Sequence, residues 1–442
     1  MSQDRIFGLQ LFTAFLTCIV SLTPVFASTQ VPGPRQDHAI ALIGGTVHTV
    51  AGPPILGGTV LFEDGIVTAV DTDVELPAGT ERIDVGHGHI YPGLIAVNTR
   101  LGLVEIRSVR ATRDYSEIGE INPNVRAETA VNPDSELIPV ARGNGITMAH
   151  TVPGGGLISG CSALILLDGW TPEDMTLKAP TGLHINWPSM RIDRSPSASK
   201  SEKEQKEAIA KRIDKIRDAF AEARAYMRAK EAEGEKGIGY HDTDLRWEAM
   251  TPVLRREIPV FVNANGIKQI QAAVSWANSE NVKMVLVGGR DAWLVADLLK
   301  ENDIPVVITG THRLPSRRWE PHDLVYTIPA KYHEMGIRYC IGGIGDARNV
   351  PYNAASASAF GLPRAEAIKA ITLYPAQILG VSDRVGSIEK GKDATLIVTD
   401  GDPLEIPTNV NMEFIQGRRV DLRSRHTQLY EKYKIKYERI RN

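Results

Sequence analysis

The fold is decided near the C-terminus by residues 385–399, which read VGSIEKGKDATLIVT. Two glycines and Asp393 mark turns before the run of residues 394–399, whose β-branched side chains predict a strand. Residues 412–415 predict another strand, and the turn Gln416-Gly417 follows it. The C-terminal end of the chain is therefore predicted to be β-rich.

The N-terminal end has the same character. Residues 59–62 and 66–70 are short apolar runs on either side of Glu63-Asp64-Gly65, which is typical of a hairpin. Two β-rich ends that flank a different middle indicate one small domain built from both. We expect this β-sandwich domain to comprise residues 39–91 and 385–422.

Between these ends the chain alternates predicted strands and helices. The pattern runs through strand 259–263, helix 267–278, strand 283–287, helix 291–301 and strand 304–309. Repeated units of this spacing imply a parallel sheet, so residues 92–384 are predicted to form an α/β domain, a (β/α)8 barrel of the TIM type.

Two charged segments interrupt or follow this pattern. Residues 199–235 predict a helical insertion, in which one apolar stripe repeats at intervals of three and four, formed by Ile209, Ile213, Ile216, Phe220 and Met227. The insertion is expected to pack on the barrel; the alternative is a partner-binding helix. Residues 423–442 are charged and rich in tyrosine, which predicts a solvated terminal helix.

The composition narrows the class of protein. The 442 residues contain 50 basic and 53 acidic side chains, and 43% are hydrophobic. These values are those of an ordinary globular protein and exclude wholesale disorder. With a net charge of −3 the chain has no excess of basic residues, so nucleic acid is not an expected partner.

The first 27 residues predict a signal peptide. Residues 6–27 are predominantly apolar and uncharged, and Val25-Phe26-Ala27 resembles a small-residue cleavage site. Cleavage after Ala27 would give an exported protein, periplasmic or extracellular, with no stable membrane span; the alternative is an uncleaved anchor. The remaining cysteines, Cys161 and Cys340, are expected to be buried free thiols, although in an exported protein they could pair.

Three stretches together resemble the amidohydrolase superfamily, in particular its imidazolonepropionase-like branch. They are YPGLI at 91–95, AEAIKAITLYPA at 365–376 and VGSIEKGKDA at 385–394. The resemblance implies a metal-binding barrel with a small β-sandwich. It also implies hydrolysis of C–N bonds in amides and cyclic amides, with zinc or another divalent metal activating a water molecule.

The ligand positions of that superfamily are substituted here. By resemblance, Asn98 and Arg100 stand where the first strand should supply His-x-His, and Asn263 and Gly288 stand at the later histidines. A fixed guanidinium charge repels a divalent cation. We therefore expect no resident metal or other cofactor, and a degenerate form of the usual centre.

Two further ligand positions are ambiguous. The aspartate of the last strand is expected near Gly342-Gly343, and a slip of three residues makes Asp346 the candidate. The bridging ligand has no clear match, although the neighbourhood of His184 is one option.

Other residues at predicted strand ends form the candidate site. Asp346 and His150 are the candidate catalytic residues. The candidate pocket residues are Asn98, Arg100, His184, Asn263, Arg290 and Arg348. The arginines would make the pocket electropositive without a metal, which favours a small anionic ligand. Gly154-Gly155-Gly156 predicts a tight loop at the pocket mouth, with phosphate binding as the alternative.

These observations leave three functions open. One is hydrolysis of non-peptide C–N bonds with a rearranged site. Another is an inactive binding or scaffold protein for a small molecule. The third is a metal-free catalyst that uses Asp346, His150 and the arginines. The oligomeric state is not fixed by the sequence.

Overall fold

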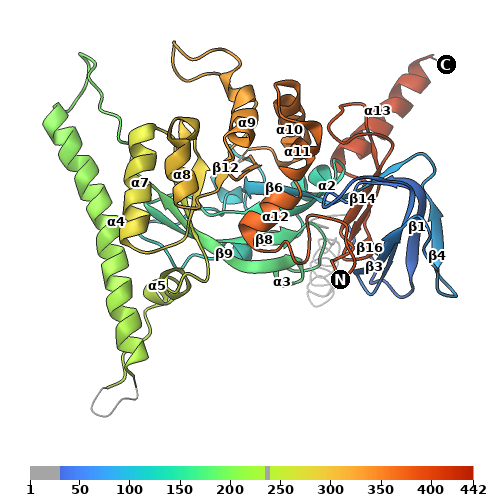
Figure 1. The fold of residues 1–442 in the computed structure, drawn as a ribbon, viewed down its shortest axis with the longest axis horizontal. Coiled ribbons are helices and arrows are strands. Elements are labelled where there is room, and N and C mark those ends of the chain that lie inside the picture. Colours follow the sequence, from blue (N-terminus) through green and yellow to red (C-terminus); the bar gives the residue numbers. More distant parts are fainter. Residues whose placement is uncertain (1–29, 234–238, 344, 442) are drawn as a thin grey trace, which may run out of the picture.

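The computed structural model describes residues 30–233, 239–343 and 345–441 (Figure 1). The predicted signal peptide, residues 1–27, lies outside the described residues. Within the described ranges, no helix is both long enough and apolar enough to cross a bilayer.

An eight-stranded sheet forms the centre of the molecule, as predicted for an α/β fold. Its strands, in spatial order, are β13 (Tyr339–Ile341), β12 (Val306–Ile308), β11 (Met284–Gly288), β10 (Val260–Ala264), β9 (Thr176–Asn186), β8 (Ile158–Leu166), β7 (Ile146–Thr151) and β6 (Leu94–Thr99). The first and last strands come together where the backbone N–H of Gly343 donates to the Val97 carbonyl at 3.0 Å. The sheet is therefore a nearly closed barrel.

Strand β8 breaks the predicted (β/α)8 repeat. It pairs antiparallel with both β7 and β9, whereas the other neighbouring strands of the barrel pair in parallel. Residues 152–157 join β7 to β8, and a parallel crossover would need a dozen residues or more. The expectation of a regular parallel barrel is wrong at this strand because the connection is too short to hold a helix.

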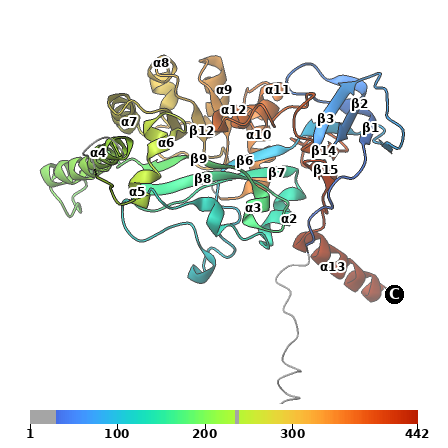
Figure 2. The same ribbon diagram turned by 90° about the horizontal axis from the view of Figure 1, so that it is seen from below.

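Helices cover the outside of the parallel part of the sheet. Figures 1 and 2 show α7 (Ile267–Ser279), α8 (Ala296–Glu301), α9 (Leu324–Glu334) and α10 (Val350–Ala359) side by side. The remaining short elements are the 3-10 turns η1 (Arg110–Thr112), η2 (Ala127–Ala130), η3 (Ala292–Val295) and η4 (Ala347–Asn349), and the helices α2 (Leu137–Arg142), α3 (Pro172–Met175), α5 (Leu245–Glu248), α6 (Thr251–Leu254), α11 (Arg364–Lys369) and α12 (Leu373–Leu379).

The predicted charged insertion is the long helix α4 (Glu202–Glu231). Ser201 caps its N-terminus and forms a capping box with Glu204. The Phe220 ring is fully buried and meets the edge of Trp276 at a centroid distance of 5.0 Å. Ile213 and Ile216 are buried on the same face. The apolar face of α4 therefore packs on the barrel.

A second sheet contains strands from both ends of the chain. Its order is β16 (Arg418–Arg419), β15 (Val410–Ile415), β14 (Leu396–Thr399), β5 (His89–Pro92), β1 (Ile40–Val47), β2 (Ile55–Glu63) and β3 (Ile66–Asp71), with β4 (Glu81–Asp84) also on β1. The predicted hairpin is β2–β3, and its turn residues Asp64 and Gly65 both have positive φ.

This second sheet curls over on itself. Phe62 of β2 and Phe414 of β15 lie several strands apart in the sheet, yet their ring centroids are 5.2 Å apart. The two rings belong to one buried cluster that also contains Leu42 and Leu396. The pairing of β5 with β14 joins the two ends of the chain, as predicted; a separate sandwich domain stays a prediction.

Among the described residues, Cys161 and Cys340 are buried and free, as expected. Burial raises the pKa of each thiol above its ordinary value. The thiols of Cys161 and Cys340 are therefore protonated and unreactive at neutral pH.

Candidate functional site

Two adjoining cavities lie at the carboxyl ends of the barrel strands, where barrel active sites form. The smaller has a volume of about 60 Å³ and is bordered by the ends of β6, β9 and β10. The larger, about 700 Å³, lies between the end of β6 and the segment that follows β13. Arg100 lines both cavities and connects them.

The smaller cavity gathers four of the pocket residues predicted from the sequence, namely Asn98, Arg100, His184 and Asn263. Three side-chain nitrogens at its wall are buried and have no hydrogen-bond partner: Asn98 Nδ2, Arg100 Nε and His184 Nε2. Buried polar atoms in folded proteins are nearly always paired. Three residues of the cavity wall thus each have a side-chain nitrogen that lacks a partner within the described part of the chain.

The backbone conformation at Asn98 sets the direction of its side chain. Its φ is +56°, in the left-handed region that asparagine tolerates better than most residues. Its backbone N–H donates to His150 at 3.4 Å, and its side chain is only 4% exposed. The end of β6 therefore twists so that the Asn98 amide reaches the cavity rather than solvent.

His184 presents a neutral imidazole to the same cavity. Its ring stacks on Phe261 at a centroid distance of 4.9 Å with an interplanar angle of 3°. Burial lowers its pKa to about 3, so the ring carries no charge at neutral pH. His184 can exchange a hydrogen bond with a ligand without adding charge to the site.

Arg100 brings the positive charge. Its guanidinium carbon lies 3.6 Å from the centroid of the Tyr115 ring. Gly154 lies beside both side chains, and a Cβ added there would come within 2.6 Å of Arg100 Nη2. Burial lowers the pKa of the guanidinium from its ordinary value, and nearby Arg107 acts in the same direction. Among the described residues, no carboxylate pairs with Arg100.

Asn186 and Asn263 complete the far wall. Asn263 Nδ2 donates to Asn186 Oδ1 at 3.4 Å. Asn186 Nδ2 in turn donates to the carbonyls of Gly155 and Gly156. The glycine loop is thereby tied to the end of β9 and borders the small cavity, in agreement with its expected place at the pocket mouth.

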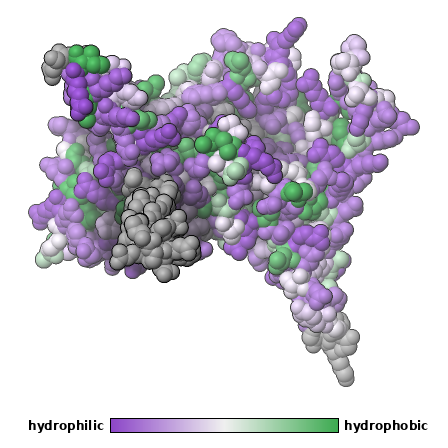
Figure 3. Space-filling view, turned by 180° about the vertical axis from the view of Figure 1, so that it is seen from behind, coloured by the Kyte–Doolittle hydropathy of each residue, from purple (hydrophilic) through white to green (hydrophobic). Residues whose placement is uncertain are grey.

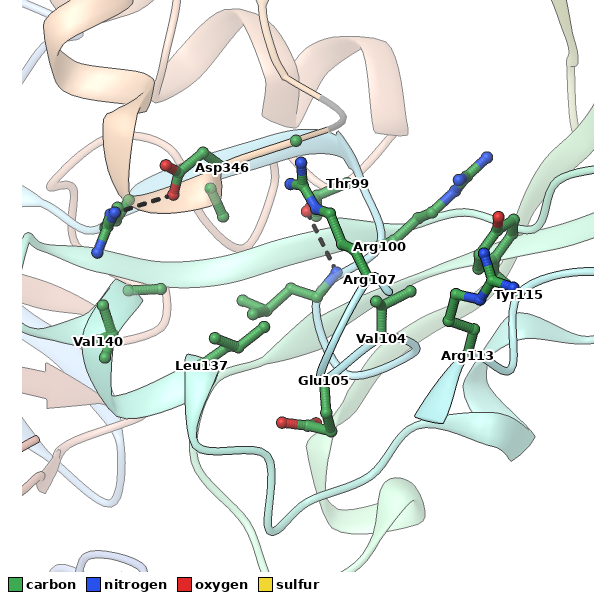
Figure 4. Close-up of a pocket in the computed structure, with 15 residues that line it drawn as sticks. Thr99, Arg100, Val104, Glu105, Arg107, Arg113, Tyr115, Leu137, Val140 and Asp346 are labelled. Atoms are coloured by element: carbon green, nitrogen blue, oxygen red, sulfur yellow. Dashed lines mark hydrogen bonds and ion pairs between the residues drawn. The ribbon is translucent and has the colours of Figure 1, made fainter. Parts of the chain in front are cut away.

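The larger cavity is rich in arginine (Figure 4). Its wall contains two carboxylates, Glu105 and Asp346, and four guanidinium groups, those of Arg100, Arg107, Arg113 and Arg348. Arg348 pairs with Asp346 at 3.2 Å, whereas Arg100 faces Tyr115 (Figure 4). The excess of positive charge suits an anionic ligand.

His150 lies in a different environment from the one the catalytic hypothesis requires. Its Nδ1 accepts from the Asn98 backbone, so its Nε2 carries the proton and faces Thr181 Oγ1 at 3.1 Å. The Thr181 hydroxyl is also hydrogen-bonded to the Ser162 hydroxyl, which donates to the Gly182 carbonyl. The ring is completely buried, and burial lowers its pKa well below the ordinary value. With both nitrogens occupied, the geometry favours a structural role.

The other candidates are spread out. Asp346 is exposed and accepts from Asn349 Nδ2 at 2.9 Å, so it faces the larger cavity from the rim. Arg348 is beside it. Arg290 lines neither cavity; its Nη1 donates to Ser316 at 2.6 Å. The structure brings Arg290 to a neighbouring surface cluster with Arg317 and Asp291 rather than to the other candidates.

The residues that stand at the expected ligand positions offer few metal ligands. Arg100 has only N–H donors, whereas Asn98 has one side-chain carbonyl oxygen. Gly288 has a φ of +95°, and a Cβ placed there would come within 2.6 Å of Asn265. Across the described ranges, no group of three or more His, Cys, Asp or Glu side chains is arranged to hold a metal.

Sequence reasoning missed several lining residues. Arg107, Arg113 and Tyr115 come from the long segment after β6, where the absence of periodicity gave no reason to bring them back to the strand ends. The one available signal was the run of arginines in residues 107–113, directly after a predicted barrel strand.

Comparison with known proteins is consistent with this architecture. Residues 334–420 match the model of the amidohydrolase family. The curated protein Amidohydrolase tasK of Hapsidospora irregularis is 23% identical over 427 residues, which is 89% of this chain and 42% of that protein. The chain therefore spans less than half the length of this relative.

Solved structures share the fold. An amidohydrolase from Thermotoga maritima MSB8 has a TM-score of 0.77 and 27% identity, over 87% of this chain and 100% of that one. An adenosine deaminase from Xanthomonas campestris, solved with bound zinc, has a TM-score of 0.50 and 15% identity, over 92% of this chain and 100% of that one. The C-terminal segment thus carries the family's sequence pattern, and the described chain has the fold of its solved members.

Proposed function

We propose that this amidohydrolase-family chain is an exported protein that binds a small carboxylate-bearing molecule at the barrel strand ends, with Arg100 at the centre of the site. The observation that carries the proposal is that Asn98, Arg100 and His184 line one cavity and that each has a buried side-chain nitrogen without a hydrogen-bond partner. Leaving a buried polar group unpaired costs about 1–3 kcal/mol. A ligand that accepts these hydrogen bonds recovers that cost.

The size and charge of the cavities support a carboxylate. The small cavity has a volume of about 60 Å³, and each water molecule occupies about 30 Å³ in the liquid, so it suits a group of about two or three heavy atoms. Arg100 also lines the larger cavity of about 700 Å³, into which the rest of the ligand would extend. The arginine excess there adds attraction for a negative charge without a metal.

The test is thermal unfolding of the purified protein with acetate, succinate and benzoate, against sodium chloride and sulfate at equal ionic strength. A carboxylate present at about 100 times its dissociation constant adds about 2.7 kcal/mol of stability, which raises the unfolding temperature measurably. Arg100→Met should abolish this gain. Arg290→Met, which removes an arginine outside both cavities, should keep it. Equal stabilisation by chloride, or equal loss in both variants, would refute the proposal.

A second candidate function is hydrolysis of non-peptide C–N bonds, such as those of cyclic amides. The family match over residues 334–420 and the likeness to solved amidohydrolases favour it. It requires a metal bound through ligands other than the family's own, or metal-free catalysis at Asp346. Metal analysis of protein purified without chelator separates the two functions: less than about a tenth of an equivalent after zinc reconstitution would contradict a metallohydrolase.

Export is part of the same proposal. Residues 1–27 have the sequence of a signal peptide, so the protein isolated from its host should begin at Ser28. Intact-mass measurement distinguishes this product from an uncleaved anchor. Either result leaves the ligand site unchanged, because none of its lining residues lies before Asn98.

A further inference from the structure

The C-terminal helix α13 (Arg425–Arg441) projects away from the rest of the molecule. Figures 1 and 2 show its C-terminal end extending away from both sheets. Figure 3 shows the same end from behind, at the upper left, with hydrophobic and charged side chains together on the surface. Packing against the body therefore does not explain why this helix is amphipathic.

The apolar side chains of α13 lie on one face. At about 100° per residue, Leu429, Tyr430, Tyr433, Tyr437 and Ile440 fall within an arc of about 100°. All five are exposed, from 40% for Leu429 to 67% for Ile440. Ile435 is 47% exposed but points to the opposite side of the helix. Five large exposed side chains on one face indicate a surface that is covered by something outside the described chain.

Basic residues border this face. The helix has six Lys or Arg and two Glu residues, a net charge of +4 without His426. Lys434 lies along one edge of the apolar arc, and Arg425 and Lys436 lie along the other. Glu431 and Glu438 lie further round, away from the arc. Lysine and arginine stems can bury their methylenes while their charges reach an anionic surface.

A second copy of the chain is a poor partner for this face. Tyr430, Tyr433, Tyr437 and Ile440 repeat with the three- and four-residue spacing of a coiled coil. The flanking positions that would meet across such a dimer include Lys434 and Lys436, which carry the same charge. Their repulsion opposes self-association. The charge pattern calls for a negatively charged partner.

The start of the described chain lies at the base of α13. Gln30 Nε2 donates to the Arg423 carbonyl at 2.7 Å, two residues before the helix begins. The uncharged, largely apolar residues 6–27 directly precede Gln30 in the sequence. The chain's most lipid-compatible sequence thus joins the body beside its basic amphipathic helix.

We propose that α13 lies in the surface of an anionic phospholipid bilayer, with Leu429, Tyr430, Tyr433, Tyr437 and Ile440 inserted and the bordering lysines and arginines at the headgroups. Helices of this pattern bind in the plane of the interface, and tyrosine is enriched at that depth. Each basic residue near an anionic surface adds attraction that salt weakens. The protein would then hold its barrel at the membrane, whether or not the N-terminal segment is removed.

The experiment is co-sedimentation of the full chain with vesicles of phosphatidylcholine alone or with about 30% phosphatidylglycerol, in low and high salt. The N-terminal segment carries no charge after Arg5, so the binding that depends on anionic lipid reports on α13. We expect strong binding to the anionic vesicles only, and less in high salt. Ile440→Ser should weaken it about tenfold, since an inserted isoleucine gains the transfer energy of its side chain.

Ile435→Ser is the matched control, because it removes the same side chain from the opposite side of the same helix. It should leave the binding within about twofold of the parent protein, since surface substitutions away from contacts have small effects. Absence of binding to anionic vesicles, or equal effects of Ile440→Ser and Ile435→Ser, would overturn the proposal. A concentration-dependent dimer that Ile440→Ser dissociates would assign the face to a second copy instead.

Discussion

Arg100 and His184 line the same small cavity but differ in what they contribute to it. Arg100 brings a charge that no carboxylate among the described residues balances, and stacking on Tyr115 holds it at the cavity wall. His184 brings an uncharged ring with an unpaired nitrogen. Both features are costly in a folded interior, and a site for a negative ligand explains both.

The buried state of His184 makes stability depend on pH. Its pKa is about 3 in the folded protein, and an unfolded histidine titrates near 6.5. Below about pH 6.5 the unfolded chain binds a proton at this residue, whereas the folded chain binds it only near pH 3. The free energy of unfolding therefore falls as the pH falls through this window. His184→Phe, which keeps the stacking on Phe261, should reduce the slope between pH 6.5 and 4 by about 1.4 kcal/mol per pH unit.

Urea unfolding at several pH values measures this slope. His322→Gln, at an exposed histidine, is the control and should retain the slope of the parent protein. His150 is buried in the same way and should supply a second, separate contribution. An unchanged slope in His184→Phe would mean that the imidazole is not held neutral in the folded state.

The sequence predicted the place of the site better than it predicted the roles of the individual residues. Asn98, Arg100 and Asn263 could be placed together because the resemblance assigns them to ligand positions at barrel strand ends, which meet at one face. His184 joined them as an option for the bridging position. The environment of His150 could not be foreseen, since its partners Thr181 and Ser162 belong to strands whose pairing the sequence does not specify. Strand position predicts proximity, whereas hydrogen bonding decides which nitrogen is free.

Among the elements, those with local signals were predicted and those with long-range pairing were not. The β2–β3 hairpin follows from Asp64-Gly65, and α4 follows from its cap at Ser201 and its apolar stripe. Strand β8 was not predicted. An apolar run such as residues 158–166 predicts a buried strand, but only its pairing with β7 and β9 makes it antiparallel.

The contribution of α4 to stability can be measured with one substitution. Phe220 is completely buried between the helix and Trp276, so Phe220→Ala should destabilise the protein by about 3–5 kcal/mol. Lys211→Ala changes an exposed residue of the same helix and should shift stability by less than about 0.5 kcal/mol. Denaturant unfolding provides the measurement. A small effect at Phe220 would mean that α4 leaves the body, as a partner-binding helix would.

At the scale of the whole molecule, one buried carboxylate holds together parts of the chain that are far apart in sequence. Asp168 follows β8 and is 3% exposed. It accepts from the backbone N–H of Gly33 at 3.2 Å, pairs with Arg142 of α2 at 3.2 Å and pairs with Arg418 of β16 at 3.4 Å. The barrel sheet, the second sheet and the N-terminal segment therefore meet at this residue. No sequence pattern could have shown it, because each partner comes from a different region.

Asp168→Asn should consequently destabilise the whole molecule. The substitution keeps the size of the side chain but leaves two guanidinium groups, one of them almost fully buried, without their carboxylate. Breaking a buried pair from one side costs about 3–5 kcal/mol, whereas an exposed pair is worth about 0–1 kcal/mol. Asp421→Asn removes the carboxylate that pairs with the exposed Arg423 at 2.6 Å, and it is the matched control. Urea unfolding should give a large loss for Asp168→Asn and a small one for Asp421→Asn. Equal losses would show that the second sheet is held to the barrel by apolar packing alone, and that the Asp168 cluster only fills the space between them.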